Sequence, residues 1–437
     1  MSRLHPLPLC CLGGGTALLL CALARAAGLS QASSRPFVMA ALVFLFLLAA
    51  GLLFLCCRRW ETVCLALLPV GLALLLRTLL LDHVTDDYVT FLSDWAAFFR
   101  EEGGWAAVAL PKGNYTAPYL YFLAAISYLP VSDLYLIKLF SILFDVVLAW
   151  GGCRLVQALV PDDRYRGAAA FCLLLLLPTV VLNGSAWSQC DAIYAAFCLH
   201  GLAAGLEGRT RSSAFLAGLA FACKLQTVFL LPVWAVLWMS GRTRFRHLLW
   251  FPAACVLSVL PALALGKPLG DVLGVYFGQA AEYSAYLTLN APSLYALLPT
   301  DAPVNVALAA RAGILAAFLL VLGVLGWLLL RRKDLSRRAV LLAGVVFAVG
   351  IPLLLPHMHD RYFFLADILT LAWACTDRRG ILPAALTQVA SLGAYHAYLL
   401  LRYAFPMGLG AVLLLLALLR ALELLVQEVR FPRSGAR

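Results

Sequence analysis

The chain has 437 residues, of which 63% are hydrophobic and only 13% are charged, and its mean hydropathy is +0.92. Because soluble domains carry about a quarter charged residues, this composition excludes a soluble globular protein and predicts one all-α, polytopic membrane domain. The net charge is +11, but the arginines lie in short loops between apolar runs, which is typical of membrane orientation and argues against a nucleic-acid partner.

Apolar runs of roughly membrane length recur along the whole chain and predict a bundle of about 12–14 transmembrane helices. The first run is interpreted as a retained helix, because Arg25 lies late in it and a second run follows at once. The 13 cysteines are scattered and form no C-x-x-C, so they are interpreted as small buried residues. The runs lie near 7–29, 37–56, 62–81, 134–153, 167–182, 191–206, 212–223, 227–240, 247–266, 303–330, 338–355, 362–376, 380–401 and 406–427.

The arginine-rich loops define the cytoplasmic side by the positive-inside rule. They contain Arg58, Arg59, Arg154, Arg164, Arg166, Arg209, Arg211, Arg242, Arg244, Arg246, Arg378 and Arg379, with further arginines at 331–338 and 430–437. Alternation of the helices then assigns polar segments 82–118, 183–191, 224–226, 267–301 and 356–361 to the outer side. This requires that segment 115–129, which is short and bracketed by Pro118 and Pro130, is re-entrant or interfacial.

The first outer loop is rich in carboxylates, and Asp86, Asp87 and Asp94 are the candidate acid/base residues. Aromatic residues recur every three or four positions from Tyr88 to Arg100, which predicts an interfacial helix whose aromatic face lies in the headgroups. An aspartate is also a favoured helix cap, which would account for one of these acids without any catalytic role.

Two further outer segments carry polar side chains beside apolar helices. Asp191 either caps the helix that follows it or binds a sugar together with the Gln189 amide. Lys224, with Gln226, interrupts an apolar hairpin; its ammonium group either snorkels to the surface or meets a phosphate.

The segment 356–361 combines His357, His359, Asp360 and Arg361. The imidazoles and the guanidinium group suit an anion such as phosphate, whereas two histidines with an aspartate would suit a metal. Because the spacing matches no standard zinc motif, no metal is predicted. A loop before Pro292 is polar and aromatic enough to bind sugar, and it contains Gln279, Glu282, Tyr283, Tyr286 and Asn290.

Six motifs in this order resemble those of GT-C-fold membrane glycosyltransferases, in particular the bacterial group related to the second mannosyltransferase of GPI-anchor synthesis. They are D-Y-V-T-F-L-S-D-W, N-Y-T-A-P-Y-L-Y, W-S-Q-C-D-A-I-Y-A-A-F, C-K-L-Q, L-T-L-N-A-P-S-L-Y and H-M-H-D-R-Y-F. The chain departs from the family with Thr85-Asp86 where glycine is expected, and with Asp94 where proline commonly precedes the tryptophan. Which of the three aspartates is the base therefore stays open.

The resemblance implies an inverting transferase of the bacterial plasma membrane that takes mannose or glucose from a polyprenyl-phosphate donor on the extracytoplasmic face. It implies two extra N-terminal helices at 1–61, a catalytic core at 62–363 and C-terminal helices at 364–437. No cofactor is expected, although some relatives use a divalent metal, and the acceptor is a glycan, lipid or protein. The expected roles are base for Asp87, Asp86 or Asp94, phosphate binding for Lys224, His357, His359 and Arg361, and sugar or acceptor binding for Gln189, Asp191, Tyr119, Gln226 and Asn290.

Two other functions compete with this interpretation. About fourteen helices would suit a transporter or flippase of a lipid-linked saccharide, although transporters place polar groups near the middle of the membrane. A non-catalytic scaffold is the third possibility, and the segregation of acidic and cationic clusters to one face argues against it.

Overall fold

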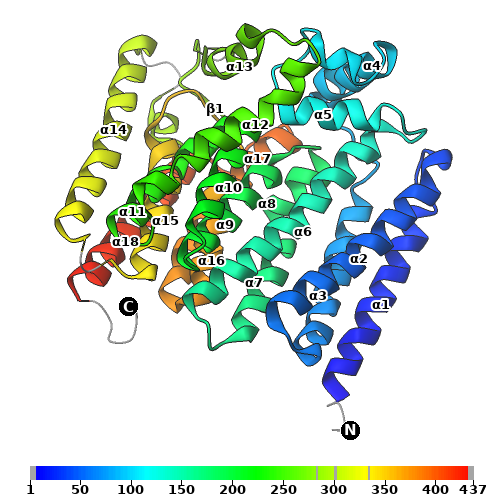
Figure 1. The fold of residues 1–437 in the computed structure, drawn as a ribbon, viewed down its shortest axis with the longest axis horizontal. Helices are drawn as coiled ribbons and strands as arrows, with labels where there is room; N and C mark the ends of the chain where they lie inside the picture. Colours follow the sequence, from blue (N-terminus) through cyan, green and yellow to red (C-terminus); the bar gives the residue numbers. More distant parts are fainter. Residues whose placement is uncertain (1–5, 282–283, 300–302, 333–334, 432–437) are drawn as a thin grey trace. The chain divides into compact units, whose positions relative to one another are not determined.

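The computed structural model describes residues 6–281, 284–299, 303–332 and 335–431. In this part of the chain there are eighteen α-helices and a single ladder of two very short strands (Figure 1). Eight helices are long and apolar enough to cross a membrane, or nine if a bent pair counts as one span. The protein is therefore an all-α, polytopic membrane protein.

The eight or nine spans are fewer than the expected 12–14, and helix length accounts for part of the difference. Several apolar runs form shorter helices, namely Ala117–Ile126, Asp191–Leu206, Leu225–Met239, Leu269–Gly278 and Phe364–Thr376. Ala117–Ile126 has ten residues, which at 1.5 Å per residue reach about 15 Å, half the hydrocarbon thickness. This helix is thus too short to cross alone, as expected for segment 115–129.

Contacts divide the described residues into two compact units whose segments interleave along the chain. The first unit comprises the described residues up to His200 together with Ala222–Lys224 and Ala254–Val275. Helices α9 (Asp191–Leu206), α12 (Trp250–Ala264) and α13 (Leu269–Ala281) are shared between the units. The other helices of the first unit are α1 (Pro6–Ala26), α2 (Arg35–Cys57), α3 (Trp60–Leu79), α4 (Ser93–Glu101), α5 (Ala117–Ile126), α6 (Asp133–Leu159), α7 (Arg164–Leu176) and α8 (Pro178–Val181).

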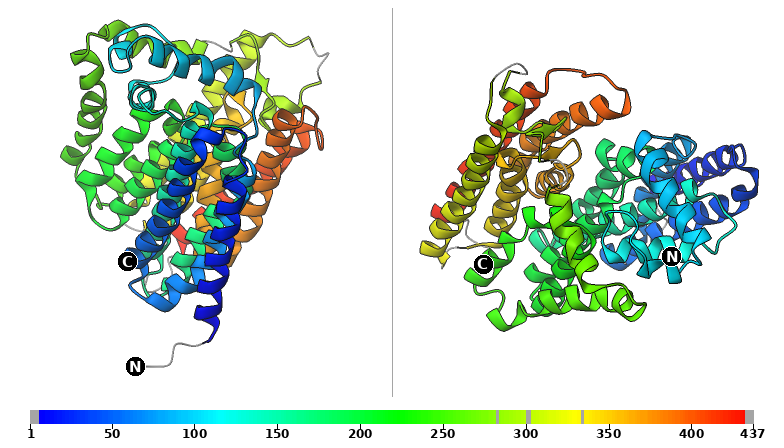
Figure 2. Two further views of the ribbon diagram at one scale, coloured as in Figure 1. Left: turned by 90° about the vertical axis from the view of Figure 1, so that its right-hand side faces the viewer. Right: turned by 90° about the horizontal axis from the view of Figure 1, so that it is seen from above.

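Helices α1, α2 and α3 run side by side (Figure 2), and α1 packs most closely against α3. Their backbones meet at two glycines, since a Cβ atom on Gly71 would lie 2.5 Å from the carbonyl oxygen of Gly15. Helix α7 is broken by Pro178, which lacks a backbone N–H and forces Leu177 into an extended conformation. The chain bends there by 50° and continues through α8 into a π-helical turn, Leu182–Ala186.

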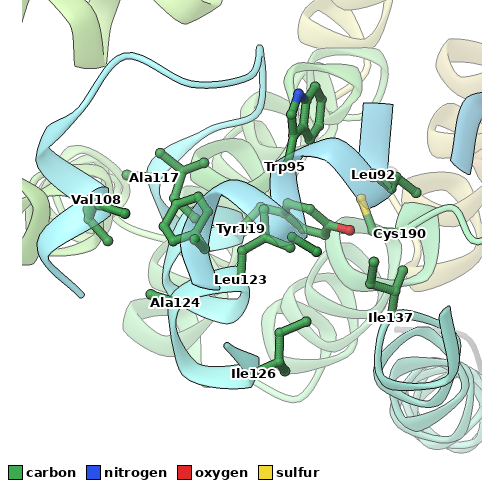
Figure 3. Close-up of a cluster of buried hydrophobic side chains, with 14 of the residues drawn as sticks. Leu92, Trp95, Val108, Ala117, Tyr119, Leu123, Ala124, Ile126, Ile137 and Cys190 are labelled. Carbon is green, nitrogen blue, oxygen red and sulfur yellow. The ribbon is translucent and has the colours of Figure 1, made fainter. Parts of the chain in front are cut away.

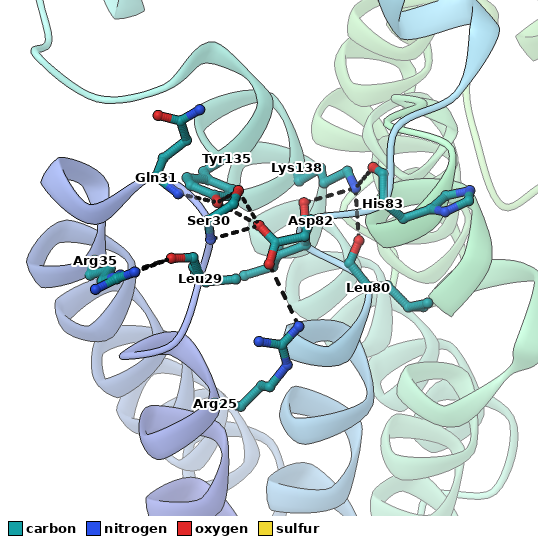
Figure 4. A network of polar contacts seen from close by, with 11 residues as sticks. Arg25, Leu29, Ser30, Gln31, Arg35, Leu80, Asp82, His83, Tyr135 and Lys138 are labelled. Atoms are coloured by element: carbon teal, nitrogen blue, oxygen red, sulfur yellow. Dashed lines mark hydrogen bonds and ion pairs between the residues drawn. The ribbon is translucent and has the colours of Figure 1, made fainter.

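Charged side chains form hydrogen bonds at both ends of the first unit. At one end, Arg164 Nη1 donates to the Cys57 carbonyl oxygen at 2.9 Å. At the other end, the Asp82 carboxylate accepts hydrogen bonds from the Tyr135 hydroxyl at 2.6 Å and the Ser30 hydroxyl at 2.8 Å (Figure 4). Partial burial raises the pKa of Asp82, but these hydrogen bonds lower it by more, and the net pKa lies below its ordinary value.

A fully buried lysine closes the end of α3 beside this network. Lys138 Nζ donates to the carbonyl oxygens of Leu80, Leu81 and His83 at 2.8, 3.1 and 2.5 Å (Figure 4). Carbonyl groups at a helix C-terminus lack intrahelical partners, and a cation there satisfies them. The chain therefore leaves α3 on a fixed path into the acidic segment.

A helix forms where the sequence predicts one, as a π-helical turn at Tyr88–Leu92 followed by α4, but the expected orientation of its aromatic residues is wrong. Trp95 is buried in a hydrophobic cluster with residues of α5 and α6 (Figure 3). Phe99 is buried in the same cluster, whereas Phe91 is exposed. Burying two large aromatic side chains against neighbouring helices removes more apolar surface from water than laying them among headgroups. The helix thus docks on the bundle with its aromatic face inward.

The second unit comprises Gly201–Phe221, Leu225–Ala253 and the described residues from Tyr276 onward. Its helices are α10 (Thr210–Cys223, apart from the last two residues), α11 (Pro232–Met239), α14 (Val306–Leu330), α15 (Arg337–Leu354), α16 (Phe364–Thr376), α17 (Ile381–Leu399) and α18 (Met407–Arg430). Helix α15 is buried along most of its length and packs against α11, α14, α16 and α18. Strands β1 (Thr288–Leu289) and β2 (Met358–His359) pair in parallel. The expected divisions near residues 61 and 363 stay predictions.

Candidate functional site

Asp87 is held by the segment that contains Gln189. One oxygen of its carboxylate, Oδ2, accepts from Trp187 Nε1 at 2.7 Å and from Gln189 Nε2 at 3.0 Å. Thr85 Oγ1 donates to the Trp187 carbonyl oxygen at 3.4 Å, which ties the two segments together a second time. The half-buried carboxylate is therefore fixed in direction by two donors, as an acid/base group requires.

The segment that supplies these donors has an unusual backbone. It follows the π-helical turn at Leu182–Ala186, and Ser188 adopts a left-handed conformation with φ of 63°. The backbone N–H of Gln189 donates to the backbone carbonyl oxygen of Asn183 at 2.9 Å. The Ser141 hydroxyl donates to the backbone carbonyl oxygen of Gln189 at 2.8 Å. A non-glycine residue with positive φ costs about 1–3 kcal/mol and persists where the surroundings over-determine it, which is common at functional sites.

Asp191 and Lys224 form a buried ion pair a few residues further on. Lys224 Nζ lies 2.5 Å from Asp191 Oδ1, and the Asn183 side-chain amide donates to Asp191 Oδ2 at 2.8 Å. Lys224 occupies the break between α10 and the 3₁₀ turn Leu225–Phe229. Because burying two charges costs several kcal/mol each, such a pair is kept only with close geometry and additional hydrogen bonds, both of which are present here.

Tyr115 connects the Asp87 group with the ion pair. Its hydroxyl donates to Gln189 Oε1 at 3.3 Å, and the Lys224 ammonium group lies 6.0 Å from the centre of its ring. The ring of Tyr119 stacks on that of Tyr115 at 4.5 Å between centroids. The structure thus brings Asp87, Gln189, Asp191 and Lys224 into one connected cluster, with Tyr119 at its edge. Tyr115 was not singled out from the sequence, although it lies in the N-Y-T-A-P motif.

The other two aspartates of the first loop lie outside this cluster. Asp86 is exposed. Asp94 is also exposed, and its carboxylate is 2.6 Å from Lys112 Nζ. Of the three candidates left open by the sequence, Asp87 alone is hydrogen-bonded to Trp187 and Gln189 among the residues that the structure describes.

The second unit contains the remaining candidates, around the β1–β2 ladder. His357 has a φ of 62°, and its Nδ1 lies 2.5 Å from the Tyr286 carbonyl oxygen. His359 belongs to β2 and forms a bridge with Asn290, whose φ is 55°. Arg361 follows directly and is largely buried, with a guanidinium nitrogen 4.0 Å from Asp360. The ladder therefore holds both histidines and Asn290 in fixed register.

Gln226 lies near His357 in the same unit, and both line a cavity of about 240 Å³ together with Phe229 and Tyr362. Glu282 and Tyr283, together with the side chain of Gln279, lie outside the described part of the chain. Within the described residues, no group of three His, Cys, Asp or Glu side chains is arranged to hold a metal ion.

A buried ion pair inside the first unit was missed at the sequence level. Arg77 Nε lies 3.0 Å from Asp145 Oδ2, and both side chains are at most 1% exposed. Arg77 Nη1 also donates to the Leu175 carbonyl oxygen at 2.8 Å, close to the break at Pro178. A Cβ atom on Gly184 would lie 3.5 Å from Asp145 Oδ2, so the pair lies directly beneath the segment that carries Gln189. The sequence feature that could have revealed this pair is the presence of one arginine and one aspartate, Arg77 and Asp145, inside otherwise apolar runs.

Taken together, the fold and the cluster define an integral membrane protein with a preorganised carboxylate at one end of a helical bundle. Comparison with models of protein families, with curated proteins and with solved structures finds no match. The function is therefore inferred from the residues of this chain.

Proposed function

We propose that the protein is a GT-C-type membrane glycosyltransferase that moves a hexose, mannose or glucose, from a polyprenyl-phosphate donor to an extracytoplasmic acceptor with inversion. The observation that supports this most strongly is the geometry of Asp87. Its carboxylate is oriented by Trp187 and Gln189 and belongs to the same cluster as the Asp191–Lys224 ion pair. Four of the six motifs that resemble the family supply the residues of this cluster.

In this proposal Asp87 accepts the proton of the acceptor hydroxyl as its oxygen attacks the anomeric carbon of the donor sugar. The bond from that carbon to the phosphate oxygen breaks, and the lipid phosphate leaves with the electron pair. The sugar-binding roles predicted for Gln189 and Asp191 are kept in the proposal. The phosphate-binding roles predicted for His357, His359 and Arg361, which belong to the second unit, are kept in the proposal.

The sequence predicts phosphate binding for Lys224, whereas in this proposal Lys224 acts on Asp191. Its ammonium group is 2.5 Å from Asp191, so it orients that carboxylate and supplies positive potential near the cluster. The active site faces outward because the arginine-rich loops mark the cytoplasmic side. The donor is a membrane lipid, and the acceptor is a glycan, lipid or protein; no cofactor is required, and a divalent metal is not expected.

The test is release of lipid phosphate from polyprenyl-phosphate mannose and from polyprenyl-phosphate glucose by membranes that contain the protein. Asp87→Asn and Arg361→Ala are expected to abolish release, while Asp86→Asn, a matched neighbouring control, retains it. Full activity of both Asp87→Asn and Arg361→Ala at normal expression would remove these residues from the mechanism.

A second candidate function, translocation of a lipid-linked saccharide, is favoured by one observation. Arg77 and Asp145 form an ion pair within two membrane-spanning helices, where charged side chains commonly mark a transport path. Passage of a lipid-linked saccharide across reconstituted vesicles, without sugar transfer, would support this function over glycosyl transfer.

A further inference from the structure

The second unit contains a large cavity that the mechanism above does not use. Its volume is about 1100 Å³, and its described walls come from residues 285–299 and 403–408 and from Val304 and Val306. Helices α14 and α18 begin at this cavity with Val306 and Met407, and both are long enough to cross the membrane. The cavity therefore lies at the ends of two spans, opposite their arginine-rich ends at Arg331 and Arg430.

The lining of this cavity, called the Tyr403 cavity below, is aromatic and uncharged. Its rings are Tyr286, Tyr295, Tyr403 and Phe405, and none of the described lining residues carries a charge. Tyr286 and Tyr403 are both about 60% exposed, so their rings are accessible to a ligand. Aromatic rings pack against the apolar faces of sugars, whereas a phosphate would require cationic donors.

A polar contact closes the cavity wall. The Tyr403 hydroxyl donates to Asn290 Oδ1 at 2.5 Å and so joins the two main segments of the lining. This contact uses the carbonyl oxygen of the Asn290 amide and leaves its NH₂ group as a donor for a hydroxyl. Asn290 adopts a left-handed backbone conformation, which asparagine tolerates better than most residues.

The cavity wall is attached to the segment that we assign to phosphate binding. Thr288 pairs with Met358 and Leu289 pairs with His359 in the two-stranded ladder. The His357 amide also donates to the Leu287 carbonyl oxygen at 2.8 Å. One strand thus faces an uncharged aromatic cavity, while the other carries His359, follows His357 and leads to Arg361.

We propose that the Tyr403 cavity binds an uncharged saccharide, namely the glycan part of the acceptor. This inference rests on the proposed glycosyltransferase function and adds the class of acceptor to it. The ladder then separates the two substrates: the anionic donor lies on the histidine side and the neutral acceptor on the tyrosine side.

The test is photolabelling of the full-length protein in lipid nanodiscs with two probes. One is a diazirine-bearing dodecyl maltoside, which is neutral; the other is a diazirine-bearing dodecyl phosphate, which is anionic. We expect the neutral probe to label peptides 284–298 and 403–408. Excess maltose is expected to reduce this labelling, whereas excess dodecanol is not. Equal labelling by the anionic probe, or competition by dodecanol alone, would show an apolar groove and overturn the proposal.

Variants locate the labelling within the cavity. Ala404→Trp fills it from an exposed lining position and is expected to lower labelling by the neutral probe at least about fivefold. Leu409→Trp, at an exposed position of α18 that does not line the cavity, is the control and leaves labelling unchanged. Asn290→Gly keeps the left-handed backbone but removes the amide, and it is expected to weaken labelling. Unchanged labelling of Ala404→Trp would place the probe elsewhere and refute the assignment.

This experiment needs no turnover, so its failure is distinguishable from failure of the proposed function. Labelling of the cavity without release of lipid phosphate from either donor would leave a saccharide-binding protein that is no transferase. Release of lipid phosphate without labelling would leave a transferase whose acceptor binds elsewhere.

Discussion

The buried pair of Arg77 and Asp145 permits the sharpest test of what holds the first unit together. Replacing Asp145 with leucine leaves the Arg77 guanidinium group charged, buried and without its carboxylate. The opposite replacement, Arg77→Met, leaves the carboxylate alone and also removes the hydrogen bond to the Leu175 carbonyl oxygen. Both single variants are expected to be strongly destabilised.

The magnitude follows from the 3.0 Å separation of the two charged groups. At an effective dielectric constant of about 20, Coulomb's law gives about 5.5 kcal/mol for unit charges at that distance. Measured losses on breaking buried pairs are about 3–5 kcal/mol, because the remaining charge stays desolvated. The double replacement Arg77→Met with Asp145→Leu removes both charges and leaves chiefly the lost bond to Leu175, about 1–3 kcal/mol.

The assay is reversible unfolding of the purified protein in mixed micelles with increasing SDS, for the native chain, both single variants and the double variant. We expect the double variant to be more stable than Asp145→Leu. A cost below about 1 kcal/mol for Asp145→Leu would show that the pair is solvated or screened like a surface pair. Additivity of the two single losses in the double variant would show that the two side chains do not interact.

Three further predictions concern the end of the first unit that carries Asp82 and Asp87. Asp87→Asn is expected to lower lipid-phosphate release by at least about a hundredfold, the usual range for a lost general base, whereas Asp94→Asn stays within a few-fold of the native rate. Lys224→Met leaves the buried Asp191 carboxylate without its cation and is expected to cost about 3–5 kcal/mol in the same unfolding assay, whereas a loss under about 1 kcal/mol would contradict the buried pair. The hydrogen bonds to Asp82 lower its pKa, so they stabilise the fold above about pH 4 and this stabilisation is lost as the pH falls through the folded-state pKa. Tyr135→Phe removes one of these hydrogen bonds, so the unfolding temperature of this variant is expected to depend less on pH between pH 6 and pH 3. An unfolding temperature that depends on pH as steeply as in the native chain would refute this role of Tyr135.

Most of the helical architecture could be predicted from apolar run length, because lipid forces the backbone to satisfy its own hydrogen bonds. The break at Pro178 illustrates how far local rules reach, since the missing N–H and the extended residue before it are consequences of proline chemistry. The inward orientation of Trp95 could not be predicted in the same way. Both lipid headgroups and neighbouring helices offer an aromatic side chain an apolar environment, and only the packing of α5 and α6 decides between them.

The candidate site likewise has features that the sequence predicts and contacts that it does not. Segments 82–118 and 183–191 were recognisable as polar loops next to apolar helices. That Asp87 meets Trp187 and Gln189 depends on the path of the chain after α3, which a buried lysine at position 138 fixes. Such contacts join residues about a hundred positions apart, and no local periodicity encodes them.

The two candidate functions, sugar transfer and saccharide translocation, require different things of Asp145 on α6, so variants at this position distinguish them. Ser141 and Asp145 lie one turn apart on that helix and both face the segment that carries Gln189. If the Arg77–Asp145 pair is only a support for that segment, an uncharged pair of similar volume restores both stability and sugar transfer. A transport path instead requires the charges themselves, so the same double variant would fold stably and fail to translocate a saccharide. Stability and activity measured on that one variant therefore decide whether the buried charges of α3 and α6 hold the site in place or are themselves the site.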